Sequence, residues 1–488
     1  MLALAGVGLF YLSIFAIGLW ASRNRQANSV SEVLVAGRRI PLWIGILTMT
    51  ATWVDGGYLN GTAEAVYGKG LIWAQAPWGF GLSLLLGGFF FAPLMHRQGF
   101  LTLLDPFQQR YGNRMGALLY LPAMCGELLW TAGILAALGT TFGVLLHLDF
   151  RVAIVLSASM TVAYTVRGGL WSIAYTDVAQ LILAASGMLL CLPFVFAQLP
   201  PLDQVFQLYG ARFGNGSQEL LNPGWWDAML LLIFGGIPWH CYFQRVLSSP
   251  SPRVAQQLSL AAALLCCLMA IPPALLGIAG AVFDWQAAGL APPAGDFVIL
   301  PTVLRDLTPR WVGLIGLCAV AGAIMSSVDA SIYSVSTMFS WNIVQQCFRP
   351  EGEEPDPNAV AHLTQRMIVV FGTLATLLAL HVQSIYSLWF LSADLVYVLL
   401  FPQLLVVLFD PRANRWGVGA GLLVGLLLRV AAGEPGLGLP AWVELPAGLP
   451  HRSLAMLAGL ATTLWVSRLP LPGGASRPVG WVTQRINC

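Results

Sequence analysis

Residues 49–62, MTATWVDGGYLNGT, interrupt an otherwise apolar span in its middle, and residues 234–245, FGGIPWHCYFQR, interrupt a second span in the same way. Each interruption contains a Gly-Gly pair and a tryptophan, and the second also contains Pro238. Glycine costs helical stability, and proline lacks the N–H that an unbroken helix needs. Free backbone groups are tolerated at bilayer depth only where protein buries them or where they line a cavity. Two interrupted spans at corresponding positions therefore predict the binding site of a transporter.

The composition of the whole chain indicates a polytopic membrane protein. Of its 488 residues, 57% are hydrophobic and 9% are charged, whereas a soluble domain has about 25% charged residues. Apolar segments that can cross a hydrocarbon core of about 30 Å recur along the whole length. They predict an all-α fold, surrounded by membrane lipid, with about 13 transmembrane helices, at 2–21, 43–66, 74–95, 115–145, 152–166, 176–197, 227–246, 254–282, 310–340, 365–382, 384–409, 414–432 and 450–467.

The distribution of basic residues predicts the orientation. With the N-terminus outside and the C-terminus in the cytoplasm, 17 of the 24 Lys and Arg side chains fall on the cytoplasmic side, as the positive-inside bias requires. Asn215, in the sequon Asn215-Gly216-Ser217, then falls in the outside loop 198–226, where a glycan can be added. The net charge of +2 gives no reason to expect a nucleic-acid partner.

The two interrupted spans also divide the chain. Each opens a group of five spans, and an odd number of spans places the two groups in opposite orientations, which is an inverted repeat. The expected parts are a peripheral helix with a cytoplasmic loop (1–42), the first repeat with its outside loop (43–226), the second repeat (227–409), and two peripheral helices with a short cytoplasmic tail (410–488). The sequence contains no CxxC, HExxH, Walker loop or nucleophile elbow, so we do not expect an enzyme.

Several long strings carry a resemblance to a known family. They include TMTATWVDGGYLNGTAEAVY, LDPFQQRYG, IAYTDVAQL, GGIPWHCYFQRVLSS, MSSVDASIYS and LWFLSADLVYVLLFPQLL. The chain resembles the choline-transporting members of the sodium/solute symporter family along nearly its whole length. This resemblance implies a five-plus-five inverted-repeat transporter fold and a plasma-membrane symporter that imports choline with sodium by alternating access. It also implies a requirement for chloride, although no residue identifies a chloride site.

Aromatic side chains are the first candidate site residues. A quaternary ammonium has no N–H to donate, and the faces of aromatic rings attract it. Trp53 and Trp239 lie in the two interruptions, and Trp130 and Trp389 lie in other spans. The resemblance matches these four to the family's choline cage, and it places Phe80 where the family has a tyrosine, so the ring is kept and the hydroxyl is lost. Because the chain has 18 tryptophans, a place in a membrane-interface belt is the alternative for each.

A sodium site is the second candidate. Sodium requires hard oxygen ligands, which the free carbonyls of an unwound helix supply. The resemblance assigns this role to the carbonyls of Ala51, Val54 and Ala323 and to the hydroxyls of Ser326 and Ser327. The alternative for the two serines is a hydrogen bond to the preceding turn of their own helix.

Acidic residues within membrane spans are the third candidate, because they are costly and usually functional. Asp227, Asp329 and Glu434 match acidic positions in the family. Asp329 follows Ser326 by three residues and is expected to support the ion, whereas Asp227 begins its span and suits a helix N-terminus. Asp55 departs from the family, which has glycine there. Its carboxylate would ligate the ion, bind a proton, offset the charge of choline, or merely cap a half-helix.

Two rival functions stay open on this evidence. One is a sodium symporter for another organic amine, which Asp55 and Phe80 would favour. The other is a choline-sensing membrane receptor that binds without transporting. The segment after the last span lacks the long tail that directs endocytic recycling in the family, so a vesicular location is not carried over from the resemblance. The sequence gives no prediction of oligomeric state.

Overall fold

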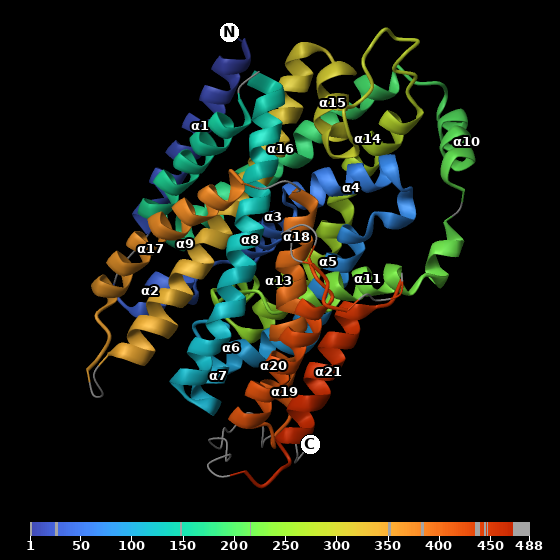
Figure 1. Cartoon of the computed structure of the whole chain (residues 1–488). Coiled ribbons are helices and arrows are strands. Elements are labelled where there is room, and N and C mark those ends of the chain that lie inside the picture. The colour runs from blue at the N-terminus through green and yellow to red at the C-terminus, as the bar shows by residue number, and fades with distance from the viewer. Residues whose placement is uncertain are drawn as a thin grey trace.

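The computed structural model describes residues 2–24, 28–146, 149–214, 216–349, 353–381, 385–434, 440–443, 446 and 448–471. These residues form a helical bundle, in which the chain starts at one end and α21 runs toward the other (Figure 1). The helices before the second interruption are α1 (Leu2–Ala21), α2 (Val30–Val35), α3 (Leu42–Trp53), α4 (Gly56–Gly68), α5 (Gln75–Leu86), α6 (Ala92–Arg97), α7 (Asp105–Tyr111), α8 (Asn113–Leu146), α9 (Phe150–Phe196), α10 (Leu202–Phe213) and α11 (Pro223–Gly235).

The helices after the second interruption complete the bundle. They are α12 (His240–Leu247), α13 (Pro252–Met269), α14 (Ile271–Val282), α15 (Ile299–Asp306), α16 (Arg310–Met338), α17 (Pro357–Ala379), α18 (Ile385–Leu395), α19 (Phe401–Phe409), α20 (Arg415–Ala431) and α21 (His451–Val466). Short 3₁₀ segments are η1 (Ser22–Asn24), η2 (Ala36–Arg38), η3 (Leu71–Trp73), η5 (Ser217–Leu221) and η6 (Asp296–Val298), and π-helical segments are η4 (Gly87–Phe91), η7 (Phe339–Phe348) and η8 (Val396–Leu400).

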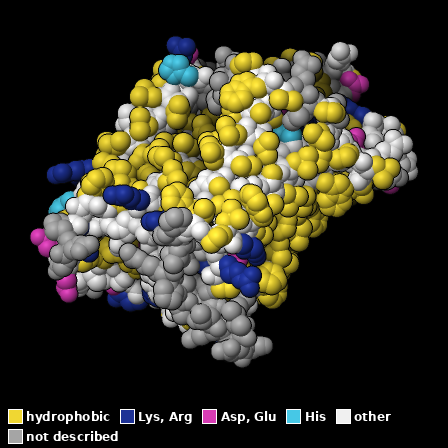
Figure 2. Space-filling model, turned by 60° about the horizontal axis from the view of Figure 1, so that its bottom comes forward, with side chains coloured by type: hydrophobic (Ala, Val, Ile, Leu, Met, Phe, Trp, Pro, Cys, Tyr) yellow, Lys and Arg dark blue, Asp and Glu magenta, His cyan; other side chains and the backbone are white. Residues whose placement is uncertain are grey.

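The structure supports a multi-pass membrane protein. Within the described residues, seven helical segments are long and apolar enough to cross a membrane, and the bent pair Val30–Arg38 and Leu42–Trp53 makes an eighth if it is one span. The predicted span 43–66 is not among them, because its two halves, α3 and α4, are separate helices of 12 and 13 residues. Each is too short to cross a membrane alone. The number of thirteen spans and the inverted repeat therefore stay predictions. Figure 2 shows hydrophobic side chains over much of one face, as expected for a surface in contact with lipid.

Two predicted spans, 152–166 and 176–197, belong to one long element. α9 contains 47 residues, and its backbone is non-helical at Gly169, where φ is 60° and ψ is −164°. At 1.5 Å per residue, α9 would measure about 70 Å if straight, which is about twice a bilayer core. Gly169 supplies the bend, since a positive φ is easily adopted only without a Cβ. The predicted connection between the two spans is thus helical apart from this residue.

The centre of the bundle is α16. It packs against α8, α9, α3 and α12, and every residue from Leu317 to Met338 is buried. This stretch contains five serines and a carboxylate. Buried polar groups need hydrogen-bond partners. Their partners lie on the helices around α16 and within its own turns, which makes α16 the place where polar chemistry is concentrated.

One connection between spans is anchored by a buried arginine. Arg110 of α7 is 1% exposed. Its guanidinium donates to the carbonyls of Val406, Val407, Asp410 and Ala413, at and just beyond the end of α19. The last carbonyls of a helix have no partner within the helix and carry partial negative charge. Arg110 therefore satisfies the C-terminus of a helix from the other half of the chain.

Candidate functional site

The first interruption is a short extended link between α3 and α4. The chain leaves α3 at Val54, whose φ and ψ are −88° and 67°, and Asp55 is extended at −94° and −172°. Asp55 caps α4, because its Oδ1 accepts the N–H of Tyr58 at 2.6 Å. A Cβ on Gly57 would lie 2.5 Å from the indole nitrogen of Trp389. The glycine therefore allows Trp389 to approach the link closely.

The second interruption is closed by its own tryptophan. α11 ends at Gly235 and α12 begins at His240, with Trp239 in extended conformation between them. The indole N–H of Trp239 donates to the carbonyl of Gly235 at 2.7 Å, which bridges the interruption. A Cβ on Gly235 would meet Tyr397 Cβ at 2.9 Å and the carbonyl oxygen of Ala393 at 3.0 Å. This link is packed tightly against α18 and η8.

The five aromatic candidates form one connected group, which we call the ring cluster: Trp53, Phe80, Trp130, Trp239 and Trp389. Ring centroids are separated by 5.1 Å for Trp239–Trp130, 6.3 Å for Trp130–Trp53, 5.0 Å for Trp53–Phe80 and 5.7 Å for Phe80–Trp389. Each side chain is at most 5% exposed. Residues of an interface belt face lipid and water at the membrane surface, whereas these five rings face one another inside the protein.

The carboxylate of Asp55 lies in the ring cluster. Its Oδ2 accepts the indole N–H of Trp130 at 2.7 Å and that of Trp389 at 3.3 Å. Asp55 is 1% exposed. Its carboxylate caps α4, which is one of the roles considered from the sequence, and it also accepts hydrogen bonds from two indoles. The indole bonds were not foreseen, because sequence does not show where an indole N–H points.

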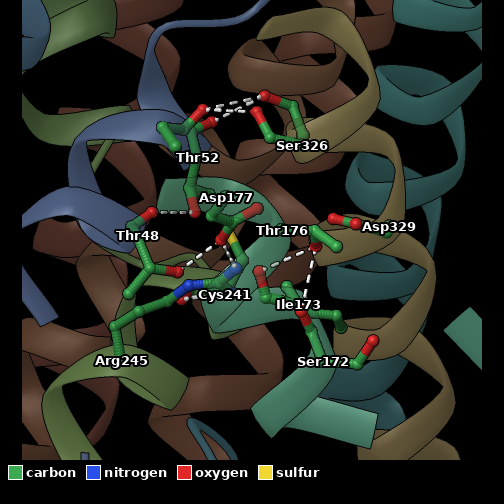
Figure 3. Close-up of polar contacts among 12 residues, drawn as sticks. Thr48, Thr52, Ser172, Ile173, Thr176, Asp177, Cys241, Arg245, Ser326 and Asp329 are labelled. Carbon is green, nitrogen blue, oxygen red and sulfur yellow. Dashed lines mark hydrogen bonds and ion pairs between the residues drawn. The ribbon is translucent and has the colours of Figure 1, made fainter. Parts of the chain in front are cut away.

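The serine pair of α16 lies against the end of α3, as Figure 3 shows for Ser326 and Thr52. Ser326 Oγ is 3.0 Å from the carbonyl oxygen of Ala51 and 2.8 Å from that of Ala323. Ser327 Oγ is 3.0 Å from the carbonyl oxygen of Thr52 and 3.4 Å from that of Ala51. Ser326 thus bonds a carbonyl in the preceding turn of its own helix, as the alternative interpretation predicts, and also a carbonyl of α3. Both bonds of Ser327 go to α3.

The donor atoms around the serine pair fit a small hard cation. Two hydroxyls and the carbonyls of Ala51, Thr52 and Ala323 converge from two helices. Each hydroxyl can rotate its O–H away and offer a lone pair instead. Val54, the remaining predicted ligand, is the residue at the end of α3. The carbonyl of Thr52 is an addition that the sequence interpretation missed.

A buried ion pair lies near the serine pair (Figure 3). Arg245 of α12 is 3.2 Å from Asp177 Oδ2 of α9, and neither side chain is exposed. Thr48 of α3 donates to the same oxygen. The sequence analysis did not single out these residues, although an acid within a span and an arginine after the second interruption were visible signals. Asp329 lies nearby on α16, where its Oδ2 accepts the Tyr164 hydroxyl at 2.7 Å.

The other two acidic candidates belong to a separate ion-pair network. Arg429 of α20 pairs with Asp394 of α18 and, at 2.5 Å, with Glu434. Asp227 Oδ1 accepts the backbone N–H of Ser453 at 2.8 Å, in the first turn of α21. Asp227 therefore caps the N-terminus of a helix, as expected, but that helix is α21 and not α11, in which Asp227 lies. Neither Asp227 nor Glu434 is in the ring cluster or at the serine pair, and Asn215 lies outside the described residues.

Comparison with known proteins gives consistent results. The family model of the sodium:solute symporter family matches residues 34–425. The high-affinity choline transporter 1 of Caenorhabditis elegans is 44% identical over 96% of this chain and 85% of its own length. The corresponding human protein is 44% identical over 96% of this chain and 84% of its own length. A substrate-bound, outward-open Na+-coupled sialic acid symporter has a TM-score of 0.83 at 17% identity, covering 98% of this chain and 99% of that chain, so it shares the fold.

Proposed function

Because the chain belongs to the sodium:solute symporter family, we propose that it is a sodium-coupled symporter that imports choline across the plasma membrane by alternating access. Its relatives are transporters and not enzymes. The single observation that carries the substrate is the ring cluster, in which five buried aromatic side chains contact one another in series and two of them donate to a buried carboxylate. Each ring face contributes about 0.5–2 kcal/mol toward a desolvated cation. A quaternary ammonium is the cation that such a cage suits best.

Sodium is the co-transported ion in this proposal. The carbonyls of Ala51, Val54 and Ala323 and the hydroxyls of Ser326 and Ser327 would hold it, together with the Thr52 carbonyl. Support comes from the bonds that already join the serine pair to the end of α3. Because α3 ends where the ring cluster begins, an ion at the serine pair would fix the link that carries Trp53 and Asp55. Binding of the ion and binding of choline would then favour each other.

Alternating access would follow from the two interruptions. The ring cluster takes Trp53, Phe80 and Trp130 from the proposed first repeat (43–226), and Trp239 and Trp389 from the proposed second repeat (227–409). Choline in the cluster would therefore contact both repeats, whose relative rocking opens the site to one side and then the other. We include in the proposal an N-terminus outside, a cytoplasmic C-terminus, a glycan on Asn215, peripheral segments 1–42 and 410–488, and a need for chloride.

Uptake into proteoliposomes tests the proposal. Purified protein, reconstituted in lipid vesicles, should accumulate labelled choline when sodium is higher outside than inside. Accumulation should stop when potassium replaces sodium, and it should fall when gluconate replaces chloride. Choline binding without accumulation under a sodium gradient would support the receptor alternative instead. Accumulation of another organic amine but not of choline would support the rival substrate.

A further inference from the structure

Asp55 closes the ring cluster into a loop. The rings contact one another in the order Trp130, Trp53, Phe80 and Trp389. The first and last of these rings both donate their indole N–H to Asp55 Oδ2. The carboxylate thus joins the two ends of the series, and it fixes the direction in which two indole planes face. A cation seated among these rings would be next to a full negative charge.

Asp55 has no cationic partner, as is also true of the buried acids Asp105, Glu127 and Asp329, but among these four in the described chain only Asp55 bonds members of the ring cluster. Asp177 pairs with Arg245, and Asp394 pairs with Arg429. Within the described part of the chain, no Lys, Arg or His side chain forms an ion pair with Asp55. Buried charges are normally paired, because an isolated one is costly. The N-terminus of α4 and the indole donors favour the ionised form, yet none of them carries a full positive charge.

The hydrogen-bonding capacity of Asp55 Oδ2 is already used. A carboxylate has about four acceptor positions, two on each oxygen. Oδ2 takes two indole N–H groups, and Oδ1 takes the N–H of Tyr58 at the start of α4. A protonated amine among the rings could donate to Oδ2 only by displacing one of the two indoles.

We propose that Asp55 is a fixed counter-charge for the transported cation, which acts through space and accepts no hydrogen bond from it. This inference rests on the proposed function and names its substrate class as quaternary ammonium. The carboxylate raises affinity for cations in general, because Coulomb attraction does not require an N–H. It adds no preference for primary, secondary or tertiary amines. Asp55 therefore determines charge selectivity, and the two indole donors on Oδ2 preserve selectivity for choline.

Three competitors of similar shape separate charge from hydrogen bonding: choline, protonated N,N-dimethylethanolamine with one N–H, and the neutral isostere dimethylbutanol. Each is measured as an inhibitor of labelled choline uptake and as a ligand that raises the melting temperature of the purified protein. In Asp55→Gly, both cations should lose affinity by about tenfold. Their ratio should stay within about twofold, and dimethylbutanol should lose less affinity than either cation, because loss of the cap and of the indole bonds affects all three ligands whereas loss of the charge affects only the cations.

A second variant tests the saturation directly. Trp130→Phe keeps a ring and removes one donor, so an acceptor position on Oδ2 becomes free. Dimethylethanolamine should then improve several-fold relative to choline. Trp239→Phe is the matched control, because its indole N–H donates to Gly235 and not to Asp55. In this control the ratio of the two affinities should not change.

Three results would overturn the inference. The first is a ratio of the two cations that shifts fivefold or more in Asp55→Gly, since Asp55 would then accept the substrate N–H. The second is unchanged affinity for both cations, which would leave Asp55 as a helix cap. The third is an equal shift of the ratio in Trp130→Phe and Trp239→Phe. Absence of sodium-driven uptake by the wild type would overturn the proposed function instead, and the melting-temperature measurements would still report on Asp55.

Discussion

The two interrupted spans satisfy the free backbone N–H and C=O groups at their interruptions in different ways. The link between α3 and α4 is capped by a carboxylate, and it lies against the hydroxyls of the serine pair and the rings around Asp55. The link between α11 and α12 has no side-chain cap on α12, and it is bridged by the indole of its own Trp239. The first link holds charged and polar oxygens in the interior of the bundle. The second link bonds its own carbonyl with its own indole, and its two glycines pack against different elements, Gly235 against α18 and η8 and Gly236 against Ser83 of α5.

This difference indicates that the two links have different functions. An interrupted helix at bilayer depth needs partners for its free backbone groups, and a ligand can supply some of them. At the first link the carbonyls of Ala51 and Thr52 are shared with two rotatable hydroxyls, which an ion can displace. At the second link the carbonyl of Gly235 is already bonded to an indole from the same segment. We infer that the first link binds ligands and that the second mainly shapes the cluster.

The largest expected effect is at the tightly packed second link. Gly235→Ala places a Cβ 2.9 Å from Tyr397 Cβ and 3.0 Å from a backbone oxygen, so the helices must separate. We expect a loss of about 1–3 kcal/mol of stability, together with a lower melting temperature and reduced choline uptake. Gly61→Ala in α4 is the control, because its Cβ would meet nothing within 4 Å. Equal loss in both variants would show that the packing at Gly235 has no special role.

Removal of the serine hydroxyls should affect sodium. The double variant Ser326→Ala and Ser327→Ala deletes two of the oxygens that face α3, so the sodium concentration for half-maximal uptake should rise about tenfold, which corresponds to 1.4 kcal/mol. Ser336→Ala on the same helix is the matched control, because its hydroxyl bonds only the preceding turn at Ile332. An unchanged sodium dependence in the double variant would remove the serine pair from the proposed ion site.

Aromatic character should matter more than size at the first link. The indole N–H of Trp53 has no hydrogen-bond partner among the described residues. Trp53→Phe should therefore retain most of the affinity for choline, whereas Trp53→Leu should lose the contribution of one ring face, about 0.5–2 kcal/mol. The measurement is the choline concentration for half-maximal uptake. Similar values for the Phe and Leu variants would argue against a cation cage.

The smallest effect is expected from the tryptophan of the second link. Trp239→Phe loses its bond to Gly235, so stability should fall by about 0.5–1.5 kcal/mol. At saturating choline, the sodium concentration for half-maximal uptake should stay at the wild-type value, because the serine pair is untouched and the ring cluster is occupied. The melting temperature and the sodium dependence are measured on the same preparation. A shift in sodium dependence would mean that the two links are coupled more closely than their contacts indicate.

Local patterns predicted the interruptions, since Gly-Gly, Pro238 and the loss of apolar residues are visible in a short window. The structure ends α3 at Trp53 and α11 at Gly235, within the quoted strings. The pairing of side chains was not predictable in this way. Asp55 meets Trp130 from 75 residues away and Trp389 from 334 residues away, and which indole edge faces it depends on how four helices pack. Asp177 and Arg245 are likewise 68 residues apart.

Helices within the connections were missed for a related reason. α2, α7, α10 and α15 lie between the predicted spans and have 6 to 12 residues each. Such short helices are marginal on their own and depend on tertiary contacts. For α7 those contacts are the bonds from Arg110 to the end of α19. The sequence shows the arginine but not the carbonyls that it binds.

The same arginine constrains the order of events during protein synthesis. Arg110 leaves the ribosome 296 to 303 residues before the carbonyls to which it donates. At 5–20 residues per second, that interval lasts about 15–60 s. Throughout this time its guanidinium must remain hydrated near the membrane surface, because burial without acceptors is costly. The end of the bundle that carries α7 can thus become dry only after α19 has been synthesised, and a nascent chain stalled before that point would expose a cationic α7 without its carbonyl partners.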